Sequence, residues 1–163
     1  MSSILTDAQI QRLVDEEKVL PADWRECMNL KPAKDAQLRG KLEVMGSNGN
    51  SFIIYLRRLE LDVFCFSAIL AYKRLDTGTT FRLRRYNGKD HAHTNKIETD
   101  EILFDYHIHK ATQRYQDGGY DEDQYAELTD KYSTINEAFG LLLDQCGFVK
   151  PLENGGLFDG TEE

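Results

Sequence analysis

The sequence predicts one α+β domain in which an antiparallel sheet of four to five strands packs against an N-terminal and a C-terminal helix. Three observations carry this prediction. The length of 163 residues fits one domain of ordinary size. Helix-start signals stand near both ends of the chain. Strand-like segments separated by turn residues fill the part between them.

The first helix is predicted to begin at Thr6. Thr6 and Gln9 have the spacing of a capping box, and the apolar Leu5 and Ile10 are placed as a hydrophobic staple. A stripe of apolar residues at helical spacing follows and ends before Pro21. We therefore expect an amphipathic helix with one face against the sheet.

Four strands are predicted between the helices, over residues 38–44, 52–59, 63–72 and 79–86. Turn residues at 46–50, at 76–78 and at Asn87-Gly88 separate or end them, which is typical of an antiparallel meander. Residues 104–115 are ambiguous, because Phe104, Tyr106 and Ile108 alternate as in a strand, whereas 107–115 could continue as a helix.

The last helix is predicted to begin at Thr134, which forms a second capping-box pattern with Glu137. Apolar residues collect on one face of this helix, and Gly147 is placed to end it. We expect Leu141 and Leu142 to be buried against the sheet. The domain should then span residues 1–150, with 151–163 as a mobile, acidic, Gly-rich tail.

Composition excludes several classes of protein. The longest apolar run, residues 63–72, is too short to cross a bilayer, and the N-terminus lacks the basic and apolar regions of a secretory signal. The three cysteines have no paired spacing, which favours free thiols in a reducing compartment. We therefore expect a cytoplasmic protein that does not associate with membranes.

The net charge of −8 is unevenly distributed. Residues 73–114 carry nine Lys and Arg against six Asp and Glu, whereas the rest of the chain carries eleven against twenty-two. An acidic chain is a poor general binder of nucleic acid, because contacts to phosphate need cations. The positive segment is nevertheless the segment that holds the histidines.

All four histidines fall within 19 residues, as two H-x-H pairs: His91 with His93, and His107 with His109. In an extended chain, residues i and i+2 point to the same face, so each pair presents two imidazoles side by side. The short connection between the pairs allows them to meet. We therefore expect at least one ring of the first pair within about 8 Å of one ring of the second.

One interpretation of this cluster is cleavage of RNA without a metal. Histidine can act as both acid and base near neutral pH, and arginine binds phosphate through a planar fork of donors. In this interpretation the four histidines are catalytic, and neighbouring residues bind phosphate or substrate, with Tyr86 orienting or stacking a base. These neighbours are Arg84, Arg85, Tyr86, Asn95, Lys110 and Arg114.

A second interpretation is a metal site. Imidazole is a good ligand for Zn and other transition metals. His91, His93 and Glu98 have the spacing H-x-H-x4-E, which resembles the first metal motif of cupins, although the second cupin motif is absent. In this alternative the four histidines hold a transition metal such as Zn, with Glu98 or Asp90 as a further ligand or as a partner of a ligand. In the first interpretation no cofactor is needed.

A family resemblance supports the first interpretation. The segments Arg84–Asn95 and Tyr106–His109, followed by Arg114-Tyr115, resemble an uncharacterised family of small bacterial proteins. They are also loosely similar to TumE-type toxins of toxin–antitoxin systems, although the His-His doublets and prolines of those toxins are missing here. This resemblance implies a small toxin-like protein acting on RNA, with an antitoxin-like protein as a partner.

A third interpretation involves no catalysis. The acidic surface could dock a basic partner, as in an inhibitor encoded by a mobile element, and the histidines would then be ordinary surface residues.

Overall fold

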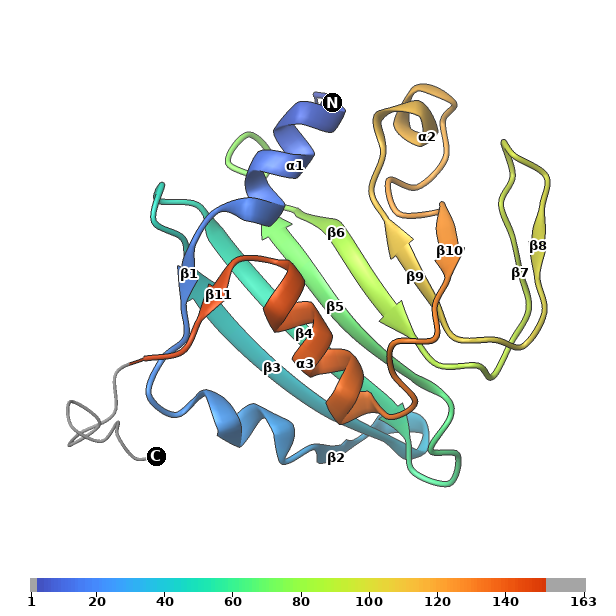
Figure 1. Ribbon diagram of the computed structural model, residues 1–163. Coiled ribbons are helices and arrows are strands. Elements are labelled where there is room, and N and C mark those ends of the chain that lie inside the picture. The colour runs from blue at the N-terminus through green and yellow to red at the C-terminus, as the bar shows by residue number, and fades with distance from the viewer. Residues whose placement is uncertain (1–2, 152–163) are drawn as a thin grey trace.

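The computed structural model describes residues 3–151. The predicted mobile tail at 151–163 lies outside these residues, apart from Pro151. Within the described range, the chain forms a mixed α/β structure built on one large antiparallel sheet (Figure 1). No helix in this range is long and apolar enough to cross a membrane.

The sheet has seven strands in the order β10-β9-β6-β5-β4-β3-β2. Their bounds are β2 (Lys31–Ala33), β3 (Gln37–Met45), β4 (Ser51–Leu59), β5 (Phe66–Lys73), β6 (Thr80–Asn87), β9 (His107–Lys110) and β10 (Ala126–Leu128). The predicted meander is confirmed as β3 to β6. The predicted number of strands was too low, because the edge strands β2 and β10 have three residues each and show no alternation that a sequence could reveal.

The main helices cover one face of the sheet. α1 (Asp7–Asp15) and α3 (Ile135–Gln145) pack on it, together with the short 3-10 helix η1 (Trp24–Met28) (Figure 1). The two predicted helix starts are confirmed, since Thr6 and Thr134 each accept a hydrogen bond from the residue three positions on. Leu142 is fully buried as predicted, whereas Leu141 is only half-buried.

The opposite face of the sheet is exposed along β3, and at its β3 and β4 end it carries both charged and apolar side chains. Along β3, Arg39 and Lys41 are exposed on this face, while Val44, on the other, belongs to the hydrophobic core under the helices. The alternation follows from the period of two in a strand, which sends successive side chains to opposite faces. This open face carries the candidate site.

Two short strand pairings and one short helix complete this part of the chain. β7 (His93–Thr94) and β8 (Glu101–Ile102) form a small antiparallel pair between β6 and β9. β1 (Lys18–Val19) runs parallel to β11 (Phe148–Val149), which joins the two ends of the described chain. The ambiguous segment 104–115 resolves into β9 followed by a loop and the short helix α2 (Gln113–Asp117).

Candidate functional site

The two H-x-H pairs meet on the open face of the sheet. The ring centroids of His107 and His109, both on β9, are 5.1 Å apart. His93 on β7 lies 4.7 Å from His109 and 5.9 Å from His107, and His91 lies 5.3 Å from His107. The predicted approach within about 8 Å is therefore confirmed, and three of the rings are mutually close.

His107 and His109 are buried, with 0 % and 2 % of their surface exposed. The Nδ1 atom of His107 lies 2.8 Å from the backbone oxygen of Asp105, and that of His109 lies 2.8 Å from the backbone oxygen of Asp123. A carbonyl oxygen only accepts hydrogen bonds, so both Nδ1 atoms carry the proton and donate it. The proton position thereby follows from the hydrogen-bond network.

The other ring nitrogen of each buried histidine is without a partner. Among the described residues, no group hydrogen-bonds Nε2 of His107 or Nε2 of His109, although both atoms are buried. Because Nδ1 holds the proton, each Nε2 presents an available lone pair. Buried polar atoms are nearly always satisfied, so two neighbouring exceptions in one cluster call for an explanation.

His93 is oriented by Asn95. Its Nε2 atom lies 3.0 Å from Oδ1 of Asn95. The same Oδ1 accepts the backbone N–H of Ala126 at 2.8 Å, and Nδ2 of Asn95 donates to the backbone oxygen of Ala126 at 2.9 Å. The amide can therefore face only one way, and His93 must donate from Nε2. Its Nδ1 is left with the lone pair.

His91 is the most accessible of the four, with 47 % of its side chain exposed. Its Nδ1 atom lies 3.1 Å from Oδ1 of Asp90. Burial alone would raise the pKa of Asp90, but hydrogen bonds from Cys65 and His91 outweigh burial and lower it. The carboxylate therefore accepts from Nδ1 of His91, and Nε2 keeps its lone pair.

The buried pair does not titrate near neutral pH. Burial lowers the pKa of His107 to about 4 and that of His109 to about 2. The charge of Arg85 acts in the same direction on both rings, while their hydrogen bonds to backbone oxygens oppose it. Both imidazoles are therefore neutral at pH 7, and protons do not compete for their lone pairs there.

Of the two neighbouring arginines, only Arg85 faces the cluster. Arg85 is the cross-strand partner of His109, so its side chain points to the same face. Its Nε atom donates to the buried carboxylate of Asp123 at 3.1 Å. Asp123 therefore holds the cluster together twice, through its side chain to Arg85 and through its backbone oxygen to His109.

The predicted roles of Arg84, Tyr86 and Lys110 at this site were wrong. Arg84 alternates with Arg85 and points to the helix-covered face, where it lies 3.4 Å from the hydroxyl of Tyr86. Tyr86 is fully buried and donates to Gln145 of α3, so it cannot stack a base. Lys110 is the cross-strand partner of Arg84 and pairs with a glutamate of β10.

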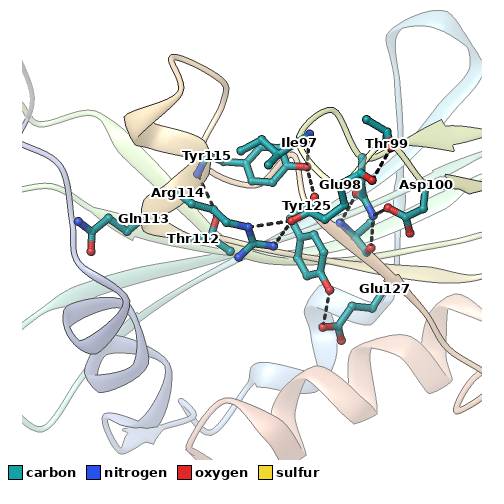
Figure 2. Close-up of polar contacts among 12 residues, drawn as sticks. Ile97, Glu98, Thr99, Asp100, Thr112, Gln113, Arg114, Tyr115, Tyr125 and Glu127 are labelled. Carbon is teal, nitrogen blue, oxygen red and sulfur yellow. Dashed lines mark hydrogen bonds and ion pairs between the residues drawn. The ribbon is translucent and has the colours of Figure 1, made fainter.

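Glu98 and Arg114 form a separate cluster (Figure 2). The carboxylate of Glu98 accepts hydrogen bonds from Arg114, at 2.8 Å from Nε, and from the hydroxyl of Tyr115, at 2.6 Å. Both oxygens of Glu98 are thus occupied, and the guanidinium of Arg114 is neutralised. The structure pairs Glu98 and Arg114 with each other and does not group Glu98 with the histidines, so their roles as metal ligand and as substrate-binding residue stay predictions. Asn95 belongs to the site as the residue that orients His93, and its role in binding phosphate or substrate stays a prediction.

Three residues of the open face were missed by the sequence. Arg57, Ser67 and Asn87 lie on β4, β5 and β6 and line a pocket beside His91. They become neighbours only through strand register, which no local sequence pattern encodes. A further support was also missed, since the hydroxyl of Tyr132 lies 2.8 Å from the backbone oxygen of Asn87 and 3.0 Å from that of His107.

The chain matches no protein-family model, no curated protein and no solved structure. The resemblance to toxin families therefore stays a prediction, and the function must be argued from the site.

Proposed function

We propose that the four histidines form a binding site for one divalent transition metal such as Zn²⁺. The observation that carries this proposal is the pair of buried Nε2 atoms of His107 and His109, which hold lone pairs and have no partner in residues 3–151, on rings whose centroids lie 5.1 Å apart. Metal-ligating histidines commonly donate their other N–H to a backbone carbonyl or carboxylate, which fixes the ring and the tautomer. Both buried histidines have this arrangement.

The spacing of the rings supports the same conclusion. Two imidazoles that share a tetrahedral Zn²⁺, with Zn–N distances of about 2.0–2.1 Å, have centroids about 5 Å apart. The separations within the trio of His93, His107 and His109 range from 4.7 to 5.9 Å. Three protein ligands and one open position are typical of a catalytic metal centre. The exposed His91 stands beside this trio as a fourth ligand or as a base.

Metal binding requires a small rearrangement. In the described residues, no group of three or more His, Cys, Asp or Glu side chains is already placed to hold a metal ion. His107 and His109 are fixed on β9, whereas His91 and His93 belong to the long connection between β6 and β9. We therefore expect the rings of His91 and His93 to turn toward the two fixed Nε2 atoms when a metal binds.

The metal-independent cleavage of RNA expected from the sequence fits this geometry less well. A general acid or base works best with a pKa near the working pH. The pKa values of His107 and His109, about 4 and about 2, are far below neutrality. Only His91 and His93 remain as acid–base candidates. Such a mechanism gives no role to the two buried rings or to their unpartnered Nε2 atoms.

Titration calorimetry with Zn²⁺ tests the metal site, using untagged protein freed of metal by a chelator. We expect one Zn²⁺ per chain, and His107→Phe should weaken binding by about 100-fold or more, because even partners of metal ligands are worth about 10- to 100-fold. All four histidines of the chain lie in the cluster, so no other imidazole can contribute.

Two control variants sharpen the titration. Cys65→Ser should leave the affinity unchanged, which excludes a site built from Cys65, Asp90 and His91. Glu98→Gln should also leave it unchanged, because both oxygens of Glu98 are occupied by Arg114 and Tyr115. Absence of saturable Zn²⁺ binding, or equal binding by the His107→Phe variant, would contradict the proposal.

A further inference from the structure

A polar line crosses the open face of the sheet and ends at the histidine cluster. Five side chains on five adjacent strands are direct cross-strand partners and therefore share one face. At about 4.8 Å per strand, the line extends for about 19 Å. Its members, from β3 to β9, are Arg39, Arg57, Ser67, Asn87 and His107.

A pocket of about 250 Å³ lies along this line. Its lining residues include Arg57 and Arg85, together with Ser67 and Asn87. Ser67 and Asn87 are both buried and give the pocket a polar floor. The pocket also reaches His91, so it opens directly onto the histidine cluster.

Several side chains of this pocket have hydrogen-bond donors that are available to a ligand. Arg57 is exposed, and within residues 3–151 its guanidinium makes only one hydrogen-bond contact, at 3.4 Å to the hydroxyl of Ser67. Asp123 engages Nε of Arg85, and no other hydrogen bond to this guanidinium is formed within residues 3–151. Oδ1 of Asn87 accepts the hydroxyl of Ser67 at 2.9 Å, which leaves the amide Nδ2 as a donor.

An anion with several oxygens matches this donor set. The two guanidiniums come from different strands and supply more N–H groups than one carboxylate can accept, whereas a phosphate offers three or four oxygens. Arginine–phosphate hydrogen bonds are charge-assisted and often bidentate. Asp90, at the side of His91, contributes an opposing charge to this lining, and Asp123 contributes a second beside Arg85. Because Arg82 also pairs with Asp123, three guanidiniums stand against these two carboxylates.

We propose that this pocket is the substrate subsite of the histidine centre and binds the phosphate group of a phosphate ester. His91 borders both places, and Arg85 is the cross-strand partner of His109, so a bound phosphate lies beside the proposed metal. The assignment as a substrate subsite rests on the proposed metal function. The binding of the anion does not, because every group that holds it belongs to the sheet.

The test measures thermal stabilisation of chelator-treated protein by inorganic phosphate at constant ionic strength, with chloride as the reference anion. We expect saturable stabilisation, as for any ligand that binds only the folded state. Arg57→Met should weaken phosphate binding by about 10-fold or more. Arg12→Met is the matched control, since it removes an exposed arginine of α1 and should leave phosphate binding unchanged.

A second variant keeps the test independent of any single side chain. Arg85→Met should also weaken phosphate binding, and Asp123 retains an ion pair with Arg82 at 3.3 Å to preserve the fold. No saturable effect of phosphate, or the same affinity in the wild type and both variants, would overturn the proposal. Loss of Zn²⁺ binding with intact phosphate binding would refute the metal site alone.

Two further ligands identify the source of the phosphate. If a mononucleotide binds as tightly as a single-stranded oligonucleotide, the substrate is a small ester. If the oligonucleotide binds more tightly and Arg39→Met removes only this gain, the ester belongs to a strand that follows the polar line. Both results support a phosphate subsite, whereas failure of inorganic phosphate, the mononucleotide and the oligonucleotide to bind contradicts it.

Discussion

Two buried polar groups of this protein differ in how many of their hydrogen-bond partners the chain itself supplies. The first is Lys18, whose side chain is fully buried between the ends of α1 and α3. Burial lowers the pKa of Lys18 to about 8, so its ammonium group remains mostly charged at pH 7. Its Nζ atom lies 2.7–2.9 Å from four backbone oxygens, those of Leu13, Val14, Glu16 and Cys146.

The histidine cluster is the second group, and it is incomplete. His107 and His109 each donate one hydrogen bond to the backbone, yet the lone pair of each Nε2 atom has no partner in the described chain. An ammonium with three donors and four acceptors needs nothing from outside the protein. The two buried lone pairs on the neighbouring rings of His107 and His109 have no such partner within residues 3–151 and are available to a ligand. We interpret Lys18 as structural and the histidines as ligands.

The largest expected effect is on Lys18. Lys18→Met keeps the apolar stem but leaves buried backbone oxygens without donors, so we expect a loss of about 4 kcal/mol in the free energy of unfolding. Urea denaturation without metal measures this change. A loss below about 1 kcal/mol would show that water reaches these oxygens and that the site is not closed.

A substitution in the apolar core provides a reference for the loss of unfolding free energy expected for Lys18→Met. Leu142 of α3 is fully buried, and Leu142→Ala should lower the free energy of unfolding by about 3 kcal/mol through lost burial and a residual cavity. The same denaturation experiment measures it. An unchanged midpoint would mean that α3 is not packed on the sheet in solution.

The third-largest effect is expected in mild acid, where His107 should lower the free energy of unfolding. The pKa of His107 is about 4 in the folded chain, against about 6.5 when unfolded, so the unfolded state takes up the proton first. The stabilisation is complete above pH 6.5 and is lost as the pH falls toward 4. His107 lies beside His91, His93 and His109. The charges of His91, His93 and Arg85 oppose its protonation, whereas His109, with a pKa of about 2, stays neutral over this range.

Other groups titrate over this range, so the measurement compares the metal-free wild type with His107→Phe. From pH 6.5 to pH 5, the wild type should lose about 1.5 kcal/mol more than the variant. Parallel pH profiles would show that His107 is accessible to protons in the folded state.

The smallest expected effect is that of His107→Phe itself at pH 7 without metal. His107→Phe removes the hydrogen bond from Nδ1 to the backbone oxygen of the exposed residue Asp105, which water can replace, and it removes no hydrogen bond of Nε2 within residues 3–151. The free energy of unfolding should therefore fall by only about 1 kcal/mol. Adding Zn²⁺ should then raise the melting temperature of the wild type only. A large loss without metal would assign His107 a structural role, like that of Lys18.

Much of the fold could be predicted from the sequence because its signals are local. Capping residues mark where α1 and α3 begin, and turn residues separate β3 to β6. β5 begins at Phe66, later than expected, because Cys65 and Asp62 close a turn before it. The three-residue strands β2 and β10 depend on partners distant in the sequence, so no local pattern announces them.

The site could be predicted only where spacing decides geometry. The i, i+2 spacing correctly predicted that His107 and His109 share one face of β9, where their ring centroids lie 5.1 Å apart. His91 lies outside β7, so the same spacing does not fix the first pair.

The sequence could not say which of Arg84 and Arg85 faces the histidine rings, because that depends on the face that α3 covers. The roles of Arg57 and Asn87 depend on register across β4, β5 and β6, which only the folded sheet defines.

The central claim is that Nε2 of His107 and of His109 are free lone pairs that bind a metal. Long-range proton–nitrogen NMR spectra of ¹⁵N-labelled histidines measure this directly, before and after one equivalent of Zn²⁺. At pH 7 without metal, both rings should be neutral with the proton on Nδ1, and Zn²⁺ should shift the resonances of both Nε2 atoms. Protonated Nε2 atoms, or Nε2 resonances that do not respond to Zn²⁺, would contradict the account.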